Sequence, residues 1–298
     1  NVPFGTSKST VISILFNCWV WARMPSARVL VGTHTEKLAL AFSMKSRSVV
    51  TSDLYQSCFP EVKLGTGQET KEYYTNTCGG ERNTCTVGGK TPMGWHFHYL
   101  IVDDPIDPQG AMSEAELDNA DRFMTEVIPS RKIDKPVSVT ILVMQRIHYR
   151  DPSAVMLRES KKEGAAPIKH ICLPGELYKK EDGSYNPDNV NPPELADNYI
   201  DGLLDQKRLP RSVLGEYKAR GDLYYATQVL QRPYPPGGGM FKEIWFNQRQ
   251  KAAPYHAIRV RAWDRAATDQ GGAYTAGVLM SMTPDPLMFY VEHVVHGQ

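Results

Sequence analysis

An α/β fold with helices flanking a parallel sheet is predicted by three short apolar segments that alternate with helix-like segments. The apolar segments span residues 28–32, 99–102 and 137–144. Continuous runs of bulky apolar residues are typical of strands buried on both faces of a parallel sheet. Residues 11–21 and 37–50 have helical length and spacing. Their alternation with the apolar segments favours parallel strands joined by crossover helices.

The amino-acid composition limits the kinds of partner and environment that we expect for this protein. The chain has 298 residues, with 34 Lys and Arg against 33 Asp and Glu, so any surface that binds a polyanion must be local. The five cysteines form no CxxC pair, which argues against a disulfide framework or zinc site and favours a reducing cytoplasm. Residues 11–20 are the most apolar run, which is too short to span a bilayer. Because the chain lacks an initial methionine and ends just after a strand-like segment, we expect a fragment of a longer protein.

The loop before the first helix-like segment has the composition of a phosphate-binding loop. Backbone N–H groups at a helix N-terminus attract anions, while Lys8 would reach the terminal phosphates and Ser9 would bind Mg²⁺. The match to GxxxxGK[ST] is imperfect, because Val2 and Ser7 stand where glycines are usual. A surface helix N-cap is the simpler alternative. The predicted nucleotide-binding residues are Gly5, Thr6, Ser7, Lys8, Ser9 and Thr10.

Two acids, Asp103 and Asp104, follow the apolar segment at residues 99–102. The carboxyl edge of a parallel sheet is where open α/β proteins bind ligands. Nucleotide hydrolysis needs two acids in this order. Asp103 would hold Mg²⁺ through its water shell, and Asp104 would orient or deprotonate the attacking water. The alternative is a strand that runs into an acidic turn.

The third strand-like segment ends in Gln145 and Arg146. Polar side chains beside the acids could sense the γ-phosphate and pass its loss to a neighbouring element, and an ordinary strand-to-loop exit is the alternative. Residues 64–94 are typical of a hairpin or loop excursion. A helix beginning at Ser113 is expected to end before Pro129, and residues 209–231 look helical.

A segment rich in Pro and Gly, residues 233–239, is the strongest boundary signal in the chain. Three strand-like segments follow it, and the first ends at Asp264. A ribonuclease H-like sheet begins in this way and collects carboxylates that bind two metal ions. Any α+β domain could equally contain such strands. The predicted division is a first domain at residues 1–232, a linker at 233–256 and a truncated second domain at 257–298.

The order of these segments resembles the large subunit of tailed-bacteriophage terminases, the DNA-packaging motors. Two matching stretches are fairly specific: Val-Met-Gln-Arg-Ile-His at residues 143–148, with Asp151 after it, and Ala-Trp-Asp-Arg-Ala-Ala-Thr at residues 262–268. The other matches are the phosphate loop, residues 100–105, residues 226–239 with 241–242, and the remainder of the stretch at residues 262–298. The likeness runs through nearly the whole chain.

The resemblance implies a P-loop packaging ATPase followed by the beginning of a ribonuclease H-like endonuclease that cuts concatemeric DNA. It implies ATP and Mg²⁺ as cofactors, with Mn²⁺ possible at the nuclease site. The implied partners are double-stranded DNA, the portal protein, the small terminase subunit and further copies in a homo-oligomeric ring. The implied location is the host cytoplasm, at the procapsid portal, with no membrane and no place in the mature virion. The implied site residues are Lys8 and Asp104 for ATP hydrolysis, Ser9 and Asp103 for Mg²⁺, Gln145 and Arg146 for coupling, and Asp264 for the nuclease metal.

The chain departs from the family pattern at two positions. Phe4 stands where relatives often carry a basic residue that acts as an arginine finger. An arginine from a neighbouring subunit is therefore expected, with Arg122 and Arg131 as candidates. Ala273 stands where relatives often have an acid, which Asp269 could partly replace. The remaining nuclease ligands are expected in the parent protein, so we expect no nuclease activity from this segment alone.

Two other classes of function remain open at this point. A DNA helicase or remodelling ATPase would share the nucleotide core, although it would carry a second motor domain after residue 240. A non-catalytic capsid or DNA-binding component with decayed nucleotide motifs is the other class, favoured by Phe4, Ser7 and Ala273.

Overall fold

The computed structural model describes residues 1–65, 67, 70–89, 94–180, 182–235, 252–264, 275–285 and 287–297, without the side chains of residues 296 and 297. The chain divides into two compact units, Asn1–Pro236 and Gly237–Gln298, and each is described by itself. The predicted boundary segment lies mostly outside the described residues, as do Asp269 and Ala273.

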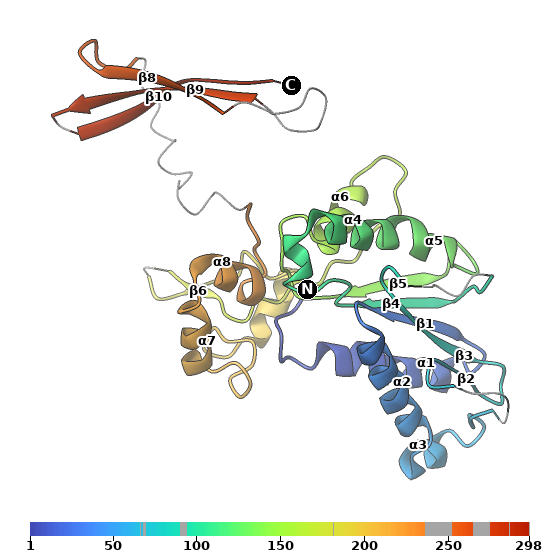
Figure 1. The fold of residues 1–298 in the computed structure, drawn as a ribbon. Helices are drawn as coiled ribbons and strands as arrows, with labels where there is room; N and C mark the ends of the chain where they lie inside the picture. The colour runs from blue at the N-terminus through green and yellow to red at the C-terminus, as the bar shows by residue number, and fades with distance from the viewer. Residues whose placement is uncertain are drawn as a thin grey trace. The chain divides into compact units, whose positions relative to one another are not determined.

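The first unit contains a five-stranded sheet in the order β2-β3-β1-β4-β5 (Figure 1). Four strands are parallel and β2 is antiparallel to β3. The mostly parallel α/β sheet predicted from the sequence is therefore confirmed. Its strands are β1 (Arg28–Thr33), β2 (Tyr73–Thr75), β3 (Glu81–Thr86), β4 (Tyr99–Asp103) and β5 (Val139–Val143).

Helices cover both faces of this sheet (Figure 1). On one face, Val29 and Val31 of β1 pack in a core with Ile14 and Trp21 of the first helix. On the other face, Leu30 packs with residues of β4 and of the helices that follow it. Burial on both faces explains the continuous apolar runs. The first face bears a π-helical turn (Thr10–Leu15), α1 (Phe16–Arg23), α2 (Glu36–Val50) and α3 (Asp53–Cys58), and the second bears α4 (Glu114–Arg122), a π-helical turn (Phe123–Val127), α5 (Ile128–Ser130) and α6 (Pro152–Glu159).

Strand β3 lies inside the stretch that the sequence predicts to be a hairpin or loop excursion. The β2–β3 pair is a hairpin, but β3 also pairs in parallel with β1 and so belongs to the main sheet. Its sequence is polar, and Arg82 is fully buried with its guanidinium 5.8 Å from the ring of Tyr74. Burial lowers the pKa of Arg82. Because an apolar pattern is what identifies a buried strand, this polar strand escapes prediction.

Two helix predictions need correction. The helix that begins at Ser113, whose hydroxyl accepts a hydrogen bond from the Glu116 N–H at 3.4 Å, continues through Pro129 to Ser130. Proline is accommodated because the helix ends one residue later and the π-helical turn before it already departs from the α-helical bond pattern, so the missing N–H interrupts few helical bonds. Residues 209–231 form α7 (Arg211–Lys218), α8 (Asp222–Tyr224) and a π-helical turn (Tyr225–Val229) instead of one helix, broken at Gly221, which has φ +119°.

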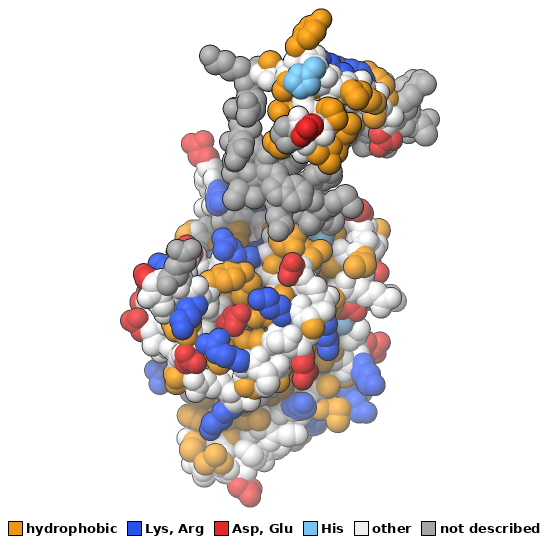
Figure 2. Space-filling model, turned by 90° about the vertical axis from the view of Figure 1, so that its left-hand side faces the viewer, with side chains coloured by type: hydrophobic (Ala, Val, Ile, Leu, Met, Phe, Trp, Pro, Cys, Tyr) orange, Lys and Arg blue, Asp and Glu red, His pale blue; other side chains and the backbone are white. Residues whose placement is uncertain are grey.

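The remaining described elements of the first unit are short. They are a two-stranded ribbon of β6 (Tyr178–Lys179) and β7 (Tyr185–Asn186), and 3₁₀ turns at Gly110–Met112 and Pro193–Asn198. On the face of the molecule shown in Figure 2, basic and acidic side chains are interspersed. Among the described helices, none has the length and apolar character needed to cross a membrane.

The second unit contains an antiparallel sheet in the order β10-β9-β8. Its strands are β8 (Ile258–Asp264), β9 (Thr275–Pro284) and β10 (Leu287–Gly297), so the three predicted strands are confirmed. Val260 pairs with Met280, which pairs with Val291, and one face of this sheet is therefore apolar. Asp264 is the last residue of β8.

Candidate nucleotide-binding site

The predicted phosphate loop and the two acids meet at the carboxyl edge of the five-stranded sheet. Strands β1, β4 and β5 run in parallel, and Thr33, Asp103 and Val143 lie side by side in the same register. The polypeptide crosses this edge again in the loop before the first helix. A parallel sheet brings together here residues that lie far apart in the sequence.

Asp103 lies at the end of β4 and is only 1% exposed. The Ser9 hydroxyl donates to its Oδ1 at 3.1 Å, and the Ser13 hydroxyl donates to its Oδ2 at 2.5 Å. Burial raises the pKa of Asp103 to about 6, although the hydrogen bond from Ser13 partly opposes this increase. Both carboxylate oxygens are thus held in fixed positions.

Asp104 is the next residue and makes a different set of contacts. Its Oδ2 forms an ion pair with the Lys8 ammonium at 2.8 Å, and its Oδ1 accepts the Gln145 N–H at 3.3 Å. The His34 ring Nδ1 lies 2.9 Å from its carbonyl oxygen. Asp104 has φ +42°, a left-handed conformation that costs a non-glycine residue about 1–3 kcal/mol. Such backbone strain is often found where a side chain must be held in a functional position.

The loop itself presents a row of backbone donors. The first helical bond runs from the Val11 N–H to the Ser7 carbonyl at 3.0 Å, so the N–H groups of Lys8, Ser9 and Thr10 have no acceptor within the helix. The helix continues from Lys8 to Arg23. Unpaired N–H groups and the positive end of a helix dipole together form an anion-binding site.

Ser7 adopts the conformation of the glycine that it replaces. Its φ is +62°, and Gly5 in the same loop has φ +73°. The residue that departs from the phosphate-loop pattern therefore has a backbone conformation that glycine also adopts. A serine in this region carries strain of about 1–2 kcal/mol that glycine avoids.

The Ser7→Gly variant is accordingly expected to raise the free energy of unfolding by about 0.5–1 kcal/mol, since relief of strain exceeds the entropy cost of glycine. Urea unfolding checks this expectation. Ser48→Gly, in the last turn of α2 where the backbone is helical, is the control and should lower stability by about 0.5 kcal/mol. If both variants lower stability equally, the left-handed conformation of Ser7 is wrong.

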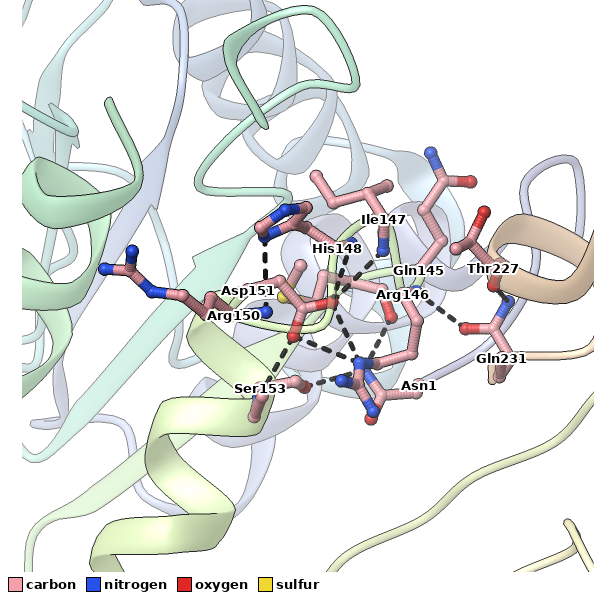
Figure 3. A network of polar contacts seen from close by, with 12 residues as sticks. Asn1, Gln145, Arg146, Ile147, His148, Arg150, Asp151, Ser153, Thr227 and Gln231 are labelled. Carbon is pink, nitrogen blue, oxygen red and sulfur yellow. Dashed lines mark hydrogen bonds and ion pairs between the residues drawn. The ribbon is translucent and has the colours of Figure 1, made fainter. Parts of the chain in front are cut away.

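The predicted coupling residues lie where the chain leaves β5 (Figure 3). The Arg146 Nε donates to both carboxylate oxygens of Asp151, at 3.0 and 2.8 Å. Asp151 is fully buried, and its oxygens also accept the N–H groups of Ile147 and His148 and of Ala154 at the start of α6. This aspartate therefore organises the loop and caps the following helix. It appears in the sequence only as an acid after the specific stretch, with no predicted role.

The Gln145 side chain contributes an unpaired acceptor. Its Oε1 is buried and has no hydrogen-bond donor among the described residues. Buried polar atoms usually have partners, so an orphaned oxygen beside a candidate active site favours an external donor such as water.

Other candidates lie away from this edge. Arg131 accepts the Phe97 N–H through its carbonyl, which places it before β4 at the opposite, amino edge of the sheet. Arg122 ends α4. Phe4 packs edge-on against Tyr217 of α7, with ring centroids 4.5 Å apart. No group of three or more His, Cys, Asp or Glu side chains suited to a metal ion is found among the described residues.

Fold and site together define a mixed α/β protein with a candidate anion-binding helix N-terminus and two acids at one sheet edge. No family model and no curated protein matches the chain. Among solved structures, the chain is similar to the crystal structure of the HK97 bacteriophage large terminase, with a TM-score of 0.49 and 12% sequence identity. The alignment covers 98% of this chain and 58% of the terminase chain, so the chain spans little more than half of that protein's length.

Proposed function

We propose that the first unit is the P-loop ATPase of a terminase large subunit that drives double-stranded DNA into a procapsid. One observation supports this most strongly: Lys8 and Ser9 of one loop contact Asp104 and Asp103 at the end of a distant strand, so the four side chains that ATP hydrolysis would use meet at one place. A surface helix N-cap would leave Lys8 in solvent, whereas its side chain is only 11% exposed.

The oxygen atoms at this edge fit a nucleotide-bound Mg²⁺. Mg²⁺ prefers one or two carboxylates with hydroxyl, water and phosphate oxygens. Asp103 and Ser9 would hold the ion, whose charge would stabilise the phosphate oxygens during transfer. Asp103 is preorganised for this task because two serine hydroxyls fix its oxygens before the ion arrives.

Lys8 and Asp104 form an ion pair in the structure. Nucleotide binding would therefore also change the contacts of Asp104. A bound polyphosphate competes with Asp104 for the Lys8 ammonium. When Lys8 turns to the phosphates, the Asp104 carboxylate becomes free to accept a proton from the attacking water. Gln145 Oε1 would accept the second hydrogen of that water and so orient it for in-line attack.

The second unit is proposed as the beginning of a ribonuclease H-like nuclease, in which Asp264 binds Mg²⁺ or Mn²⁺ with acids of the remaining protein. DNA contacts should be made mainly to phosphates and weaken with salt, because a motor must move over any sequence. The portal protein, the small subunit and a ring of copies on the procapsid in the host cytoplasm complete this proposal. Arg122 and Arg131 remain candidates for an arginine supplied to a neighbouring subunit.

ATP turnover by the whole protein, with and without linear double-stranded DNA, tests the function. DNA-stimulated turnover that falls by about 10²–10⁴-fold in Asp104→Asn would support it, because a general base of this kind supplies that factor. Asparagine tolerates the left-handed backbone of residue 104, so the fold should survive. Asp118→Asn, at an exposed acid on α4, is the control and should hydrolyse ATP normally. If neither the wild type nor Asp118→Asn turns over ATP, the non-catalytic DNA-binding component becomes the better interpretation.

A further inference from the structure

Gln231 joins the last turn of the first unit to the coupling loop (Figure 3). Its side-chain Oε1 accepts the Arg146 N–H at 2.8 Å. Its Nε2 donates to the Gln228 carbonyl at 2.6 Å and to the Thr227 carbonyl at 3.5 Å. The side chain is thereby held from both ends, and Gln231 is only 3% exposed. It also has φ +56°, so the backbone is strained where the amide is placed.

The loop after β5 is held by one side chain at each successive amide. The Gln145 N–H donates to Asp104, the Arg146 N–H donates to Gln231, and the Ile147 and His148 N–H groups donate to Asp151. Asp151 is local and Asp104 follows the neighbouring strand β4, whereas Gln231 follows the π-helical turn where the chain leaves the first unit. The peptide unit that joins Gln145 to Arg146 is planar. The position of the Arg146 N–H therefore limits the position of Gln145, whose own N–H donates to Asp104.

We propose that Gln231 is a positioning residue for Asp104, acting through the backbone of Gln145 and Arg146. The orientation of the Asp104 carboxylate then depends on the position of the segment at Gln231, where the chain leaves the first unit. This inference rests on the proposed ATPase function. Movement of that segment withdraws the acceptor from the partly buried Arg146 N–H, and a donor left without its partner is unfavourable enough to shift the loop. The shift reaches Asp104 through its bond to the Gln145 N–H.

The nearest alternative is that Gln231 only caps its own helical turn. In that case its side chain matters for stability of the turn and not for Asp104. The two roles differ at two backbone amides, because only a positioning role protects Gln145 and Arg146 from hydrogen exchange. They also differ in kinetics, since a positioning residue affects the chemical step more than substrate binding.

The experiment compares Gln231→Gly with Asp201→Gly. Residue 201 also has a positive φ, +52°, and its side chain is exposed, so both variants relieve strain and only one removes the contact to the loop. We expect Gln231→Gly to speed hydrogen exchange of the Gln145 and Arg146 amides about tenfold, with kcat about tenfold lower and KM for ATP little changed. Exchange at Ile147 and His148 should stay within about twofold, because Asp151 still holds them. Asp201→Gly should resemble the wild type.

Unchanged exchange at Gln145 and Arg146 would overturn the inference, as would faster exchange with an unaltered kcat. If the wild type hydrolyses no ATP, the proposed function fails, and faster exchange of the Gln145 amide in Gln231→Gly still supports the mechanical link to Asp104. A variant that unfolds is recognised by exchange at all core amides. Gln231→Asn then serves instead, because asparagine tolerates the left-handed backbone and its shorter side chain withdraws the acceptor from Arg146.

Discussion

Asp151→Ala is expected to lower the free energy of unfolding of the first unit by about 3–5 kcal/mol, because it leaves the Arg146 guanidinium buried without its counter-charge. The Arg146 side chain is only 13% exposed, and that of Asp151 is fully buried. The substitution also removes the acceptor from three backbone N–H groups, including the one that begins α6. Losing the helix cap alone costs about 1 kcal/mol.

A double-mutant cycle with Arg146→Met checks the origin of this loss. Arg146→Met should cost less, because Asp151 retains its backbone donors, and the double variant should be less destabilised than the sum by about 1–3 kcal/mol. The more exposed pair Arg208 and Asp205 is a matched control, since Asp205 likewise accepts nearby N–H groups. Its coupling should be below about 1 kcal/mol. Additive losses in the Arg146–Asp151 cycle would show that the buried ion pair is not formed.

The sequence predicts those parts of the fold in which local pattern and burial agree. Strands β1, β4 and β5 are apolar because both of their faces are buried, so their pattern identifies them. Strand β3 is buried as well, but its inward residues include Arg82 and Asn83, and no apolar pattern marks it. Tertiary placement between β1 and β2 makes it a strand, and a single sequence does not contain that information.

The residues of the candidate site likewise fall into two groups, those that the sequence predicts and those that it does not. Lys8, Ser9, Asp103 and Asp104 stand next to elements whose type is predictable, so their meeting at one sheet edge follows from the parallel topology. Ser13 and His34 also contact the acids, yet neither belongs to a recognisable spacing. A serine one turn after Ser9 would have been a fair candidate, because the same helix face points toward Asp103. The contact between Gln231 and Arg146 joins residues that are 85 positions apart and depends on a left-handed backbone at Gln231. No local sequence pattern predicts it.

A second large effect is expected at Asp103, where function and stability oppose each other. The pKa of this carboxyl rises from 3.8 to about 6 on folding because burial disfavours the charged form. Below about pH 4 the group is protonated in both the folded and the unfolded state, so its burial then carries no charge penalty. Between about pH 4 and 6 only the folded state keeps the proton, so stability falls as the pH rises through this window. Above pH 6 the penalty is complete, about 3 kcal/mol for a shift of roughly two units.

Asp103→Asn should therefore stabilise the metal-free protein by about 2–3 kcal/mol at pH 8 and by much less near pH 4, where the wild type is already neutral. Urea unfolding in the presence of a chelator, at both pH values, measures the difference. Asp118→Asn, at an exposed acid, is the control for a substitution that removes a carboxylate without relieving burial. A gain of equal size at both pH values would contradict the buried, ionised carboxylate.

The same variant should lose Mg²⁺-dependent nucleotide binding, because an amide is a weaker ligand for a hard cation than a carboxylate. Fluorescent-nucleotide titration with and without Mg²⁺ separates this loss from binding to the loop amides, which needs no metal. A protein that becomes more stable while its Mg²⁺-dependent affinity falls would show that Asp103 is kept charged for the ion and not for the fold. If stability rises and Mg²⁺ dependence persists, Ser9 and Asp103 are not the metal ligands, and the proposed ATPase chemistry needs another acid.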